Sequence, residues 1–214
     1  KTHLLQATGN QISSEFPDKK IKYMSSEKFT TGVVSAIRNR TVNMFRSLYR
    51  EIDLLIIDDV QFLAGKEKTQ EELFHTFNAL YENGKQIVFS SDRPPRAIPA
   101  LEERLRSRFE GGMIADISYP EFETRFAIAR SKLQEKGFEL DDKVVELVAK
   151  RVQKNIREIE GILNKLIFHQ ITYKRPLDPV TTEKIISEVT NKSASRATPT
   201  QVIRAVSAFF EISP

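Results

Sequence analysis

Apolar and polar residues form two kinds of pattern in the first 119 residues of the chain, one typical of strands and one typical of helices. Short runs rich in apolar residues, bounded by polar or turn-forming ones, predict four strands, at residues 20–24, 53–59, 86–90 and 115–118. Apolar residues at helical spacing before, between and after these runs predict helices at residues 2–16, 25–39, 42–49, 69–83 and 99–109. Strands that alternate with helices predict an α/β domain built on a parallel sheet.

Tyr119-Pro120 marks a domain boundary, because every apolar pattern that follows it has helical spacing. Residues 1–119 are therefore expected to form the α/β domain, and residues 120–195 a small all-α lid domain. Four lid helices are expected, at residues 121–136, 141–153, 155–172 and 181–190.

The last part of the chain has a different composition. Residues 191–198 are polar, as in a linker, and Pro199 suits the first turn of a last helix that ends near Phe210. We expect residues 196–214 to be a linker and the first helix of a truncated third domain.

Composition limits the classes of function. The 214 residues are 40% hydrophobic and 29% charged, which is ordinary for a globular protein. The absence of cysteine and the scatter of the three histidines exclude disulfides, thiol catalysis and a zinc site. A net charge of +4 mildly favours an anionic partner without identifying nucleic acid. With no signal peptide and no transmembrane segment in the pattern, the expected compartment is the cytoplasm.

The most informative chemistry lies where the run at residues 53–59 ends in two carboxylates, Asp58 and Asp59. Acids at the carboxyl end of a central parallel strand lie where such sheets bind ligands. Lys1-Thr2 matches the last two residues of a phosphate-binding loop, whose lysine reaches the β- and γ-phosphates and whose hydroxyl ligates Mg²⁺. From these residues alone, a nucleoside triphosphatase and an ordinary buried strand after an unrelated lysine are equally good interpretations.

Longer segments carry a more specific resemblance, at residues 1–7 (KTHLLQA), 23–29 (YMSSEKF), 58–63 (DDVQFL), 70–80 (QEELFHTFNAL) and 155–161 (NIREIEG). They resemble the bacterial chromosomal replication initiator family, DnaA, over almost the whole chain. The resemblance implies an α/β fold, the AAA+ P-loop NTPase core with a parallel sheet, followed by a small all-α lid. It also implies that residues 197–214 begin a DNA-reading domain.

The resemblance implies a site for ATP or ADP and Mg²⁺. It assigns nucleotide binding to Lys1, Thr2, His3 and Asp58, with Thr2 and Asp58 as the Mg²⁺ ligands. Asp59 is implied to orient or activate the attacking water, a division of labour that needs adjacent acids at one strand end. The alternative for the two acids is that they cap a helix.

Three more residues receive roles from the resemblance. Asp92 resembles a catalytic sensor of the γ-phosphate, although an aspartate before Pro-Pro also suits a simple turn. Arg108 resembles an arginine finger that reaches the ATP of a neighbouring subunit, the alternative being a solvated helix charge. Arg157 resembles a second sensor that touches the nucleotide from the lid, the alternative being a surface ion pair with Glu158 or Glu160.

DNA is the implied second ligand. Residues 27–50 resemble an initiator-specific helical insertion that faces single-stranded DNA, and Val34, Lys66 and Lys68 are the predicted contacts. The basic residues of the insertion are Lys28, Arg38, Arg40 and Arg46. A backbone-tracking basic groove suffices for such binding, because opening a duplex needs no base reading.

The implied function is ATP-dependent initiation of replication by a slow, switch-like ATPase. Subunits with ATP would assemble into a filament at the origin, and hydrolysis would reset it. Origin DNA, the replicative helicase, regulators and acidic phospholipid are the other implied partners, with a cytoplasmic, nucleoid-associated location. An AAA+ adaptor or a helicase loader is the alternative. The presence of Lys1, Asp59 and Arg108 disfavours the adaptor, and the helix expected after residue 197 disfavours both.

Overall fold

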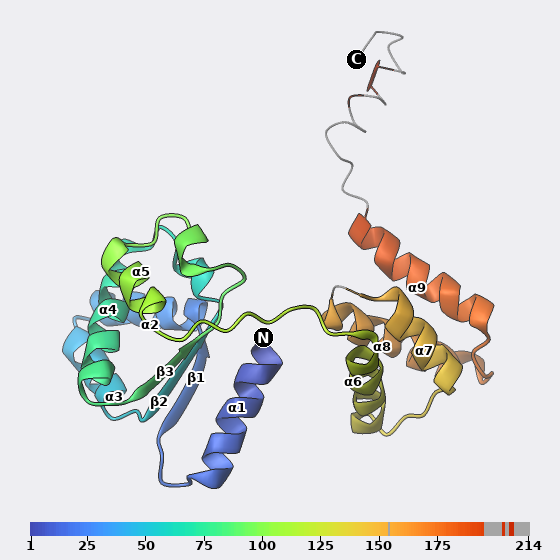
Figure 1. Ribbon diagram of the computed structural model, residues 1–214, viewed down its shortest axis with the longest axis horizontal. Coiled ribbons are helices and arrows are strands. Elements are labelled where there is room, and N and C mark those ends of the chain that lie inside the picture. Colours follow the sequence, from blue (N-terminus) through green and yellow to red (C-terminus); the bar gives the residue numbers. More distant parts are fainter. Residues whose placement is uncertain (154, 195–202, 204–205, 208–214) are drawn as a thin grey trace. The chain divides into compact units, whose positions relative to one another are not determined.

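The computed structural model describes residues 1–153, 155–194, 203, 206 and 207, and it divides into two compact units (Figure 1). We call residues 1–117 the core unit and residues 118–214 the helical unit. Their predicted identities as nucleotide-binding core and lid stay predictions at this point.

The core unit is built on a three-stranded parallel sheet with the order β1-β2-β3. The strands are β1 (Ile21–Ser25), β2 (Leu54–Asp58) and β3 (Gln86–Phe89). Every residue of the central strand β2 is buried, as expected for a parallel strand covered on both faces. The predicted α/β fold with a parallel sheet is confirmed.

Helices cover both faces of this sheet. They are α1 (Thr2–Glu15), α2 (Ser26–Arg38), α3 (Val42–Arg50), α4 (Glu67–Glu82) and α5 (Glu103–Glu110), with short 3₁₀ turns η1 (Val60–Leu63) and η2 (Pro95–Ala97). Figure 1 shows α1 alone on one face and α2, α3 and α4 on the other. Each predicted helix of this unit is present, although α5 begins four residues later than expected.

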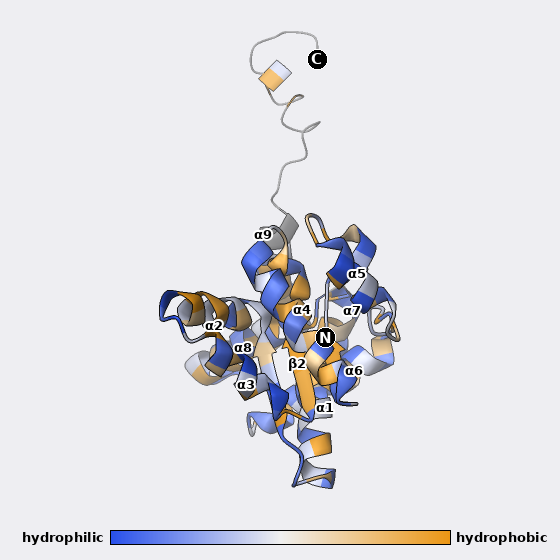
Figure 2. Cartoon of the chain, turned by 90° about the vertical axis from the view of Figure 1, so that its left-hand side faces the viewer, coloured by the Kyte–Doolittle hydropathy of each residue, from blue (hydrophilic) through white to orange (hydrophobic). Residues whose placement is uncertain are grey.

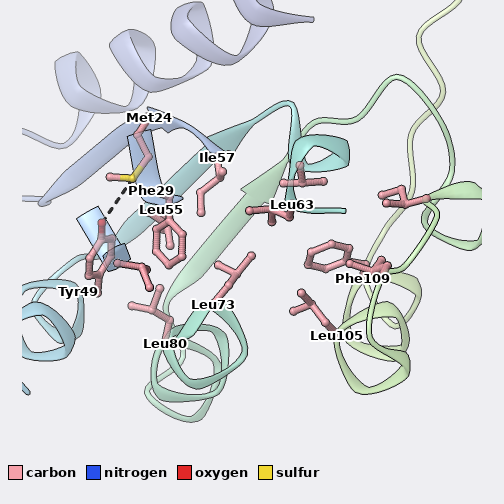
Figure 3. Close-up of a cluster of buried hydrophobic side chains, with 14 of the residues drawn as sticks. Met24, Phe29, Tyr49, Leu55, Ile57, Leu63, Leu73, Leu80, Leu105 and Phe109 are labelled. Carbon is pink, nitrogen blue, oxygen red and sulfur yellow. Dashed lines mark hydrogen bonds between the residues drawn. The ribbon is translucent and has the colours of Figure 1, made fainter. Parts of the chain in front are cut away.

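An apolar cluster packs one face of the sheet against its helices. Leu55 and Ile57 point toward α2 and α4, into a cluster with Phe29, Leu73 and Leu80 (Figure 3). The apolar colour of β2 stands out against the hydrophilic α5 in Figure 2. The residues that follow the strands are therefore attached to a well-packed sheet.

Over residues 118–194, apart from residue 154, the helical unit forms helices α6 (Phe122–Glu135), α7 (Asp142–Arg151), α8 (Ile156–Tyr173) and α9 (Pro179–Ala194). They share one buried apolar cluster, in which Val145, Val148, Ile159 and Leu163 are inaccessible to solvent. All four predicted helices are confirmed. None of the helices in the described part of the chain is long and apolar enough to cross a membrane.

Two predictions about the backbone are wrong. Residues 115–118 form no strand, and the described sheet ends at β3. A strand needs a neighbour that accepts and donates backbone hydrogen bonds, and no described strand flanks this segment. Residues 191–194, predicted as linker, continue α9, because helix growth adds a hydrogen bond per residue and no glycine or proline stops it. Residues 195–198 and most of the predicted helix 199–210 lie outside the described residues.

Candidate nucleotide-binding site

Distant segments of the core unit meet at the edge of the sheet where its strands end. At the start of α1, Thr2 Oγ1 donates a hydrogen bond of 2.6 Å to Asp58 Oδ2, the last residue of β2. Lys1 Nζ donates a hydrogen bond of 2.6 Å to the backbone oxygen of Ser91, which follows β3. The residues predicted to end the phosphate-binding loop therefore lie beside the predicted acid pair.

Asp58 is a buried carboxylate, only 3% exposed. Burial alone raises the pKa of such a group, but hydroxyl hydrogen bonds from Ser90, Thr2 and Tyr23 outweigh burial and hold the pKa of Asp58 below its usual value. Tyr23 OH donates to Oδ2 at 3.1 Å, and Ser90 Oγ donates to Oδ1. Asp58 is thus kept ionised at neutral pH without a cation of its own.

Asp59 has a left-handed backbone, with φ 59° and ψ 49°. Aspartate tolerates this conformation better than most residues. Its backbone N–H donates to Ser90 Oγ at 3.0 Å, and its carbonyl accepts from Ser26 Oγ at 2.7 Å. The two adjacent acids differ in access to solvent, because Asp58 is buried and Asp59 is partly exposed.

The predicted sensor Asp92 is exposed, and its carboxylate forms two hydrogen bonds of 2.8 Å with Arg93. The hydrogen bonds from Arg93 lower the pKa of Asp92. Ser90, which the sequence analysis did not select, is the residue after β3 that bonds to both acids. The strand register explains the contact: Ile57 pairs with Phe89, so the residues that follow them, Asp58 and Ser90, are neighbours. The sequence alone carries no signal for this register.

Thr2 and Asp58 fit the Mg²⁺ role predicted for them. A hydroxyl oxygen and a carboxylate oxygen 2.6 Å apart are hard donors, and Mg²⁺ is commonly held by one or two protein oxygens together with substrate phosphates and water. No group of three or more acidic or histidine ligands exists in the described part of the chain.

Three other predicted residues lie on helices α1, α5 and α8 of the two units. His3 is exposed in the first turn of α1. Arg108, on α5, rests over the rings of Phe77 and Tyr81, at 5.9 and 5.8 Å from their centroids. Arg157 is exposed in the first turn of α8, where its backbone N–H donates to Asn155 Oδ1, and it belongs to the other unit.

The predicted DNA contacts lie on the surface of the core unit. Val34, on α2, is 56% exposed. Lys66 precedes α4, and Lys68 forms an exposed ion pair with Glu71. Three further exposed apolar residues, which the sequence pattern did not single out, lie near Val34 in the chain on α2 and α3, namely Ile37, Met44 and Leu48.

Together, the parallel sheet and the lysine-threonine and acid pairs at its carboxyl edge define a P-loop nucleoside triphosphatase, and the helical unit after it is typical of the AAA+ class. The fold is shared with the RuvB branch migration motor of Thermotoga maritima, at a TM-score of 0.60 and 19% identity, over 86% of this chain and 57% of that chain. Residues 1–116 match the family described as the bacterial DnaA ATPase domain. The chain belongs to this family.

Close relatives agree with this assignment. The chromosomal replication initiator DnaA of Deinococcus deserti is 47% identical over 214 residues, which are 100% of this chain and 47% of that protein. The chain thus spans about half the length of the curated relatives it matches. Domain III of Thermotoga maritima DnaA has a TM-score of 0.84 and 40% identity, covering 88% of this chain and 79% of that one. A replication initiator DnaA bound to AMPPCP and single-stranded DNA has a TM-score of 0.71 and 36% identity, covering 100% and 61%.

Proposed function

We propose that this chain binds ATP with Mg²⁺, hydrolyses it slowly, and acts within an initiator of chromosomal replication. The observation that carries the proposal is the 2.6 Å hydrogen bond between Thr2 and Asp58, which joins the end of a phosphate-binding motif to the acid strand. Relatives described as bound to AMPPCP and to single-stranded DNA support it. The helicase, regulators and acidic phospholipid as partners, and a cytoplasmic location, belong to the same proposal.

Lys1 would bind the terminal phosphates. Within the described residues its ammonium contacts a backbone carbonyl and forms no ion pair, so its charge is not cancelled by a carboxylate. A cation placed at the phosphates lowers the repulsion that otherwise opposes binding of the triphosphate. Arg157 of α8 would add a second cation from the lid.

Asp58 and Asp59 would divide the chemistry. Thr2 and Asp58 would hold Mg²⁺, which shields phosphate charge when it is bound. Asp59 would take the proton of a water molecule as that water's oxygen bonds to the γ-phosphorus and the bond to the bridging oxygen breaks. The different burial of the two carboxylates, with Asp58 buried and Asp59 partly exposed, suits these separate tasks.

Arg108 would act on the nucleotide of a neighbouring subunit. Aromatic rings hold its guanidinium, and no ion pair with a described carboxylate neutralises it. Cation–π contacts therefore orient the charge and leave it available for a phosphate. Because a contact of this kind joins two different faces, it repeats head to tail and builds an open filament.

The exposed surface of α2 and α3 would meet DNA in that filament. Val34 and Met44 are 56% and 68% exposed, and Arg38 and Arg40 lie exposed in the same segment. Exposed apolar side chains beside basic ones suit the bases and phosphates of a single strand. Arg46, which the sequence analysis grouped with these basic residues, instead forms two hydrogen bonds with Glu72.

Sedimentation velocity of the full-length protein tests the proposal. With Mg²⁺ and a single-stranded oligonucleotide, ATP should produce large assemblies and ADP should leave monomers. Arg108→Ala should abolish the assemblies while ATP binding persists. Arg104→Ala is the matched control, because Arg104 lies one turn away on α5 and is paired with Glu102. A wild-type protein that stays monomeric with ATP would support the adaptor alternative and refute the proposed switch.

A further inference from the structure

Gln61 has a distinctive place beside the acid pair. It lies in η1, two residues after Asp59, and it is partly buried. Gln61 Nε2 donates a hydrogen bond of 3.1 Å to Asp59 Oδ1. Gln61 Oε1 accepts a hydrogen bond of 3.3 Å from the backbone N–H of Asp92. One side chain therefore joins the acid at the end of β2 to the loop after β3.

The orientation of this amide follows from its two partners. A carboxylate oxygen only accepts hydrogen bonds and a backbone N–H only donates them, so Nε2 must face Asp59 and Oε1 must face Asp92. Reversing the amide would break both bonds at once. The arrangement hence has a single satisfied state, in which the amide fixes the distance between Asp59 and the loop.

The described residues offer no other hydrogen-bond donor to the Asp59 carboxylate. Ser90 and Ser26 bond only to the backbone of Asp59, so they set the path of the chain and leave the carboxylate free to rotate. Gln61 restricts that rotation. Moreover, the loop to which it is tied carries Ser91, whose carbonyl accepts the hydrogen bond of Lys1.

We propose that Gln61 is a positioning residue that orients the Asp59 carboxylate for water activation and couples this orientation to the loop at residues 90–92. The proposal rests on the proposed ATPase function and deepens it. When a nucleotide draws Lys1 or the loop toward its phosphates, the backbone N–H of Asp92 moves. The amide then shifts, and with it the carboxylate that faces the water.

The test compares three variants of the full-length protein with wild type in steady-state ATP hydrolysis. Gln61→Leu removes both hydrogen bonds at nearly the same size. Gln61→Glu retains the acceptor for Asp92 but replaces the donor with an oxygen that repels Asp59. Gln86→Glu is the matched control. Gln86 is an exposed glutamine at the start of β3, and so lies at the amino ends of the strands, whereas the candidate site lies at their carboxyl ends.

Both Gln61 variants should lower kcat about tenfold to a hundredfold, the range expected when a reacting group is misplaced by a fraction of an ångström to an ångström. KM, the dissociation constant for ADP and the thermal midpoint should stay at wild-type values, which a merely structural role would not allow. Gln86→Glu should behave as wild type.

The outcomes separate this inference from the function on which it rests. Wild-type kcat in either Gln61 variant, with wild-type hydrolysis present, overturns the positioning role alone. A loss of kcat that comes with raised KM and a lowered thermal midpoint also overturns it, since the residue would then serve folding. A wild-type protein that hydrolyses no more ATP than Lys1→Ala overturns both the proposed function and the inference.

Discussion

At the scale of single residues, hydrogen bonds from hydroxyl groups keep the buried Asp58 carboxylate ionised. Asp58 is surrounded by three hydroxyl donors from α1, β1 and the loop after β3. Hydrogen bonds from neutral donors favour the charged form of a carboxylate and offset the cost of its burial. The Asp58 carboxylate is therefore ionised although it is buried.

Ser90 should contribute more to the free energy of unfolding than its neighbour Ser91. Ser90→Ala removes a donor from buried Asp58 and an acceptor from the Asp59 N–H, and unsatisfied groups of this kind cost about 1–3 kcal/mol each. Urea denaturation at neutral pH measures the loss. Ser91→Ala is the control and should change stability by less than about 0.5 kcal/mol, since its hydroxyl accepts only a 3.3 Å bond from Arg93 in an exposed loop. Equal losses of stability in Ser90→Ala and Ser91→Ala would contradict the stabilising role of the Ser90 hydroxyl.

At the scale of elements, Asp53 forms hydrogen bonds that connect the residues before the three strands. Asp53 precedes β2 and accepts hydrogen bonds from Lys85 Nζ at 2.7 Å and from the backbone N–H of Lys20 at 3.0 Å. Lys20 precedes β1 and Lys85 precedes β3. The sequence analysis placed Asp53 in a strand and missed this role, because it depends on neighbours about 30 residues away.

Asp53 predicts a pH dependence of folding. The hydrogen bonds from Lys85 and Lys20 lower the pKa of Asp53 to about 2, against about 3.9 in an unfolded chain. A lowered folded pKa means that the stabilisation is complete above pH about 4 and is lost as the pH falls toward 2. The difference in urea midpoint between wild type and Asp53→Asn should therefore shrink over this range. A difference that stays constant from pH 5 to 2 would show that Asp53 does not titrate as expected.

An ion pair between α3 and α4 gives a second prediction for elements. Arg46 binds both carboxylate oxygens of Glu72, whose side chain is 9% exposed. Arg46→Ala leaves this buried charge unpaired and should cost about 1–3 kcal/mol in the free energy of unfolding. Lys68→Ala, which breaks the exposed pair with Glu71 on the same helix, should cost less than about 1 kcal/mol. Thermal or urea denaturation of both variants compares the two pairs.

At the scale of the whole molecule, the proposed DNA binding depends on the exposed surface of α2 and α3. Val34→Glu places a negative charge on exposed α2 and should weaken binding of a single-stranded oligonucleotide about tenfold, because phosphate contacts are electrostatic. Fluorescence anisotropy with ATP at fixed salt measures it. Val180→Glu is the control: it makes the same change at an 81% exposed residue of α9 and should bind like wild type. Equal loss in both variants would point to net charge and not to a site on α2.

Local patterns predicted the helices and three strands well, because burial on one face leaves a periodic trace in the sequence. Residues 115–118 show the limit of that signal: their apolar pattern resembles a strand, yet pairing depends on a neighbour elsewhere. The late start of α5 has a similar cause. Gln70 on α4 accepts the N–H of Glu102 and donates to the carbonyl of Ala100, which holds the residues before α5 outside the helix.

The sequence by itself determined the parallel α/β class, the position of Asp58 and Asp59 after a buried strand, and the family, because these depend on periodicity and on contiguous motifs. Only the tertiary structure decided which side chains complete the site. Thr2 is 56 residues from Asp58 in the chain, and Ser90 is 32 residues from it. Contacts over such separations are set by strand register and helix packing, which no local pattern encodes.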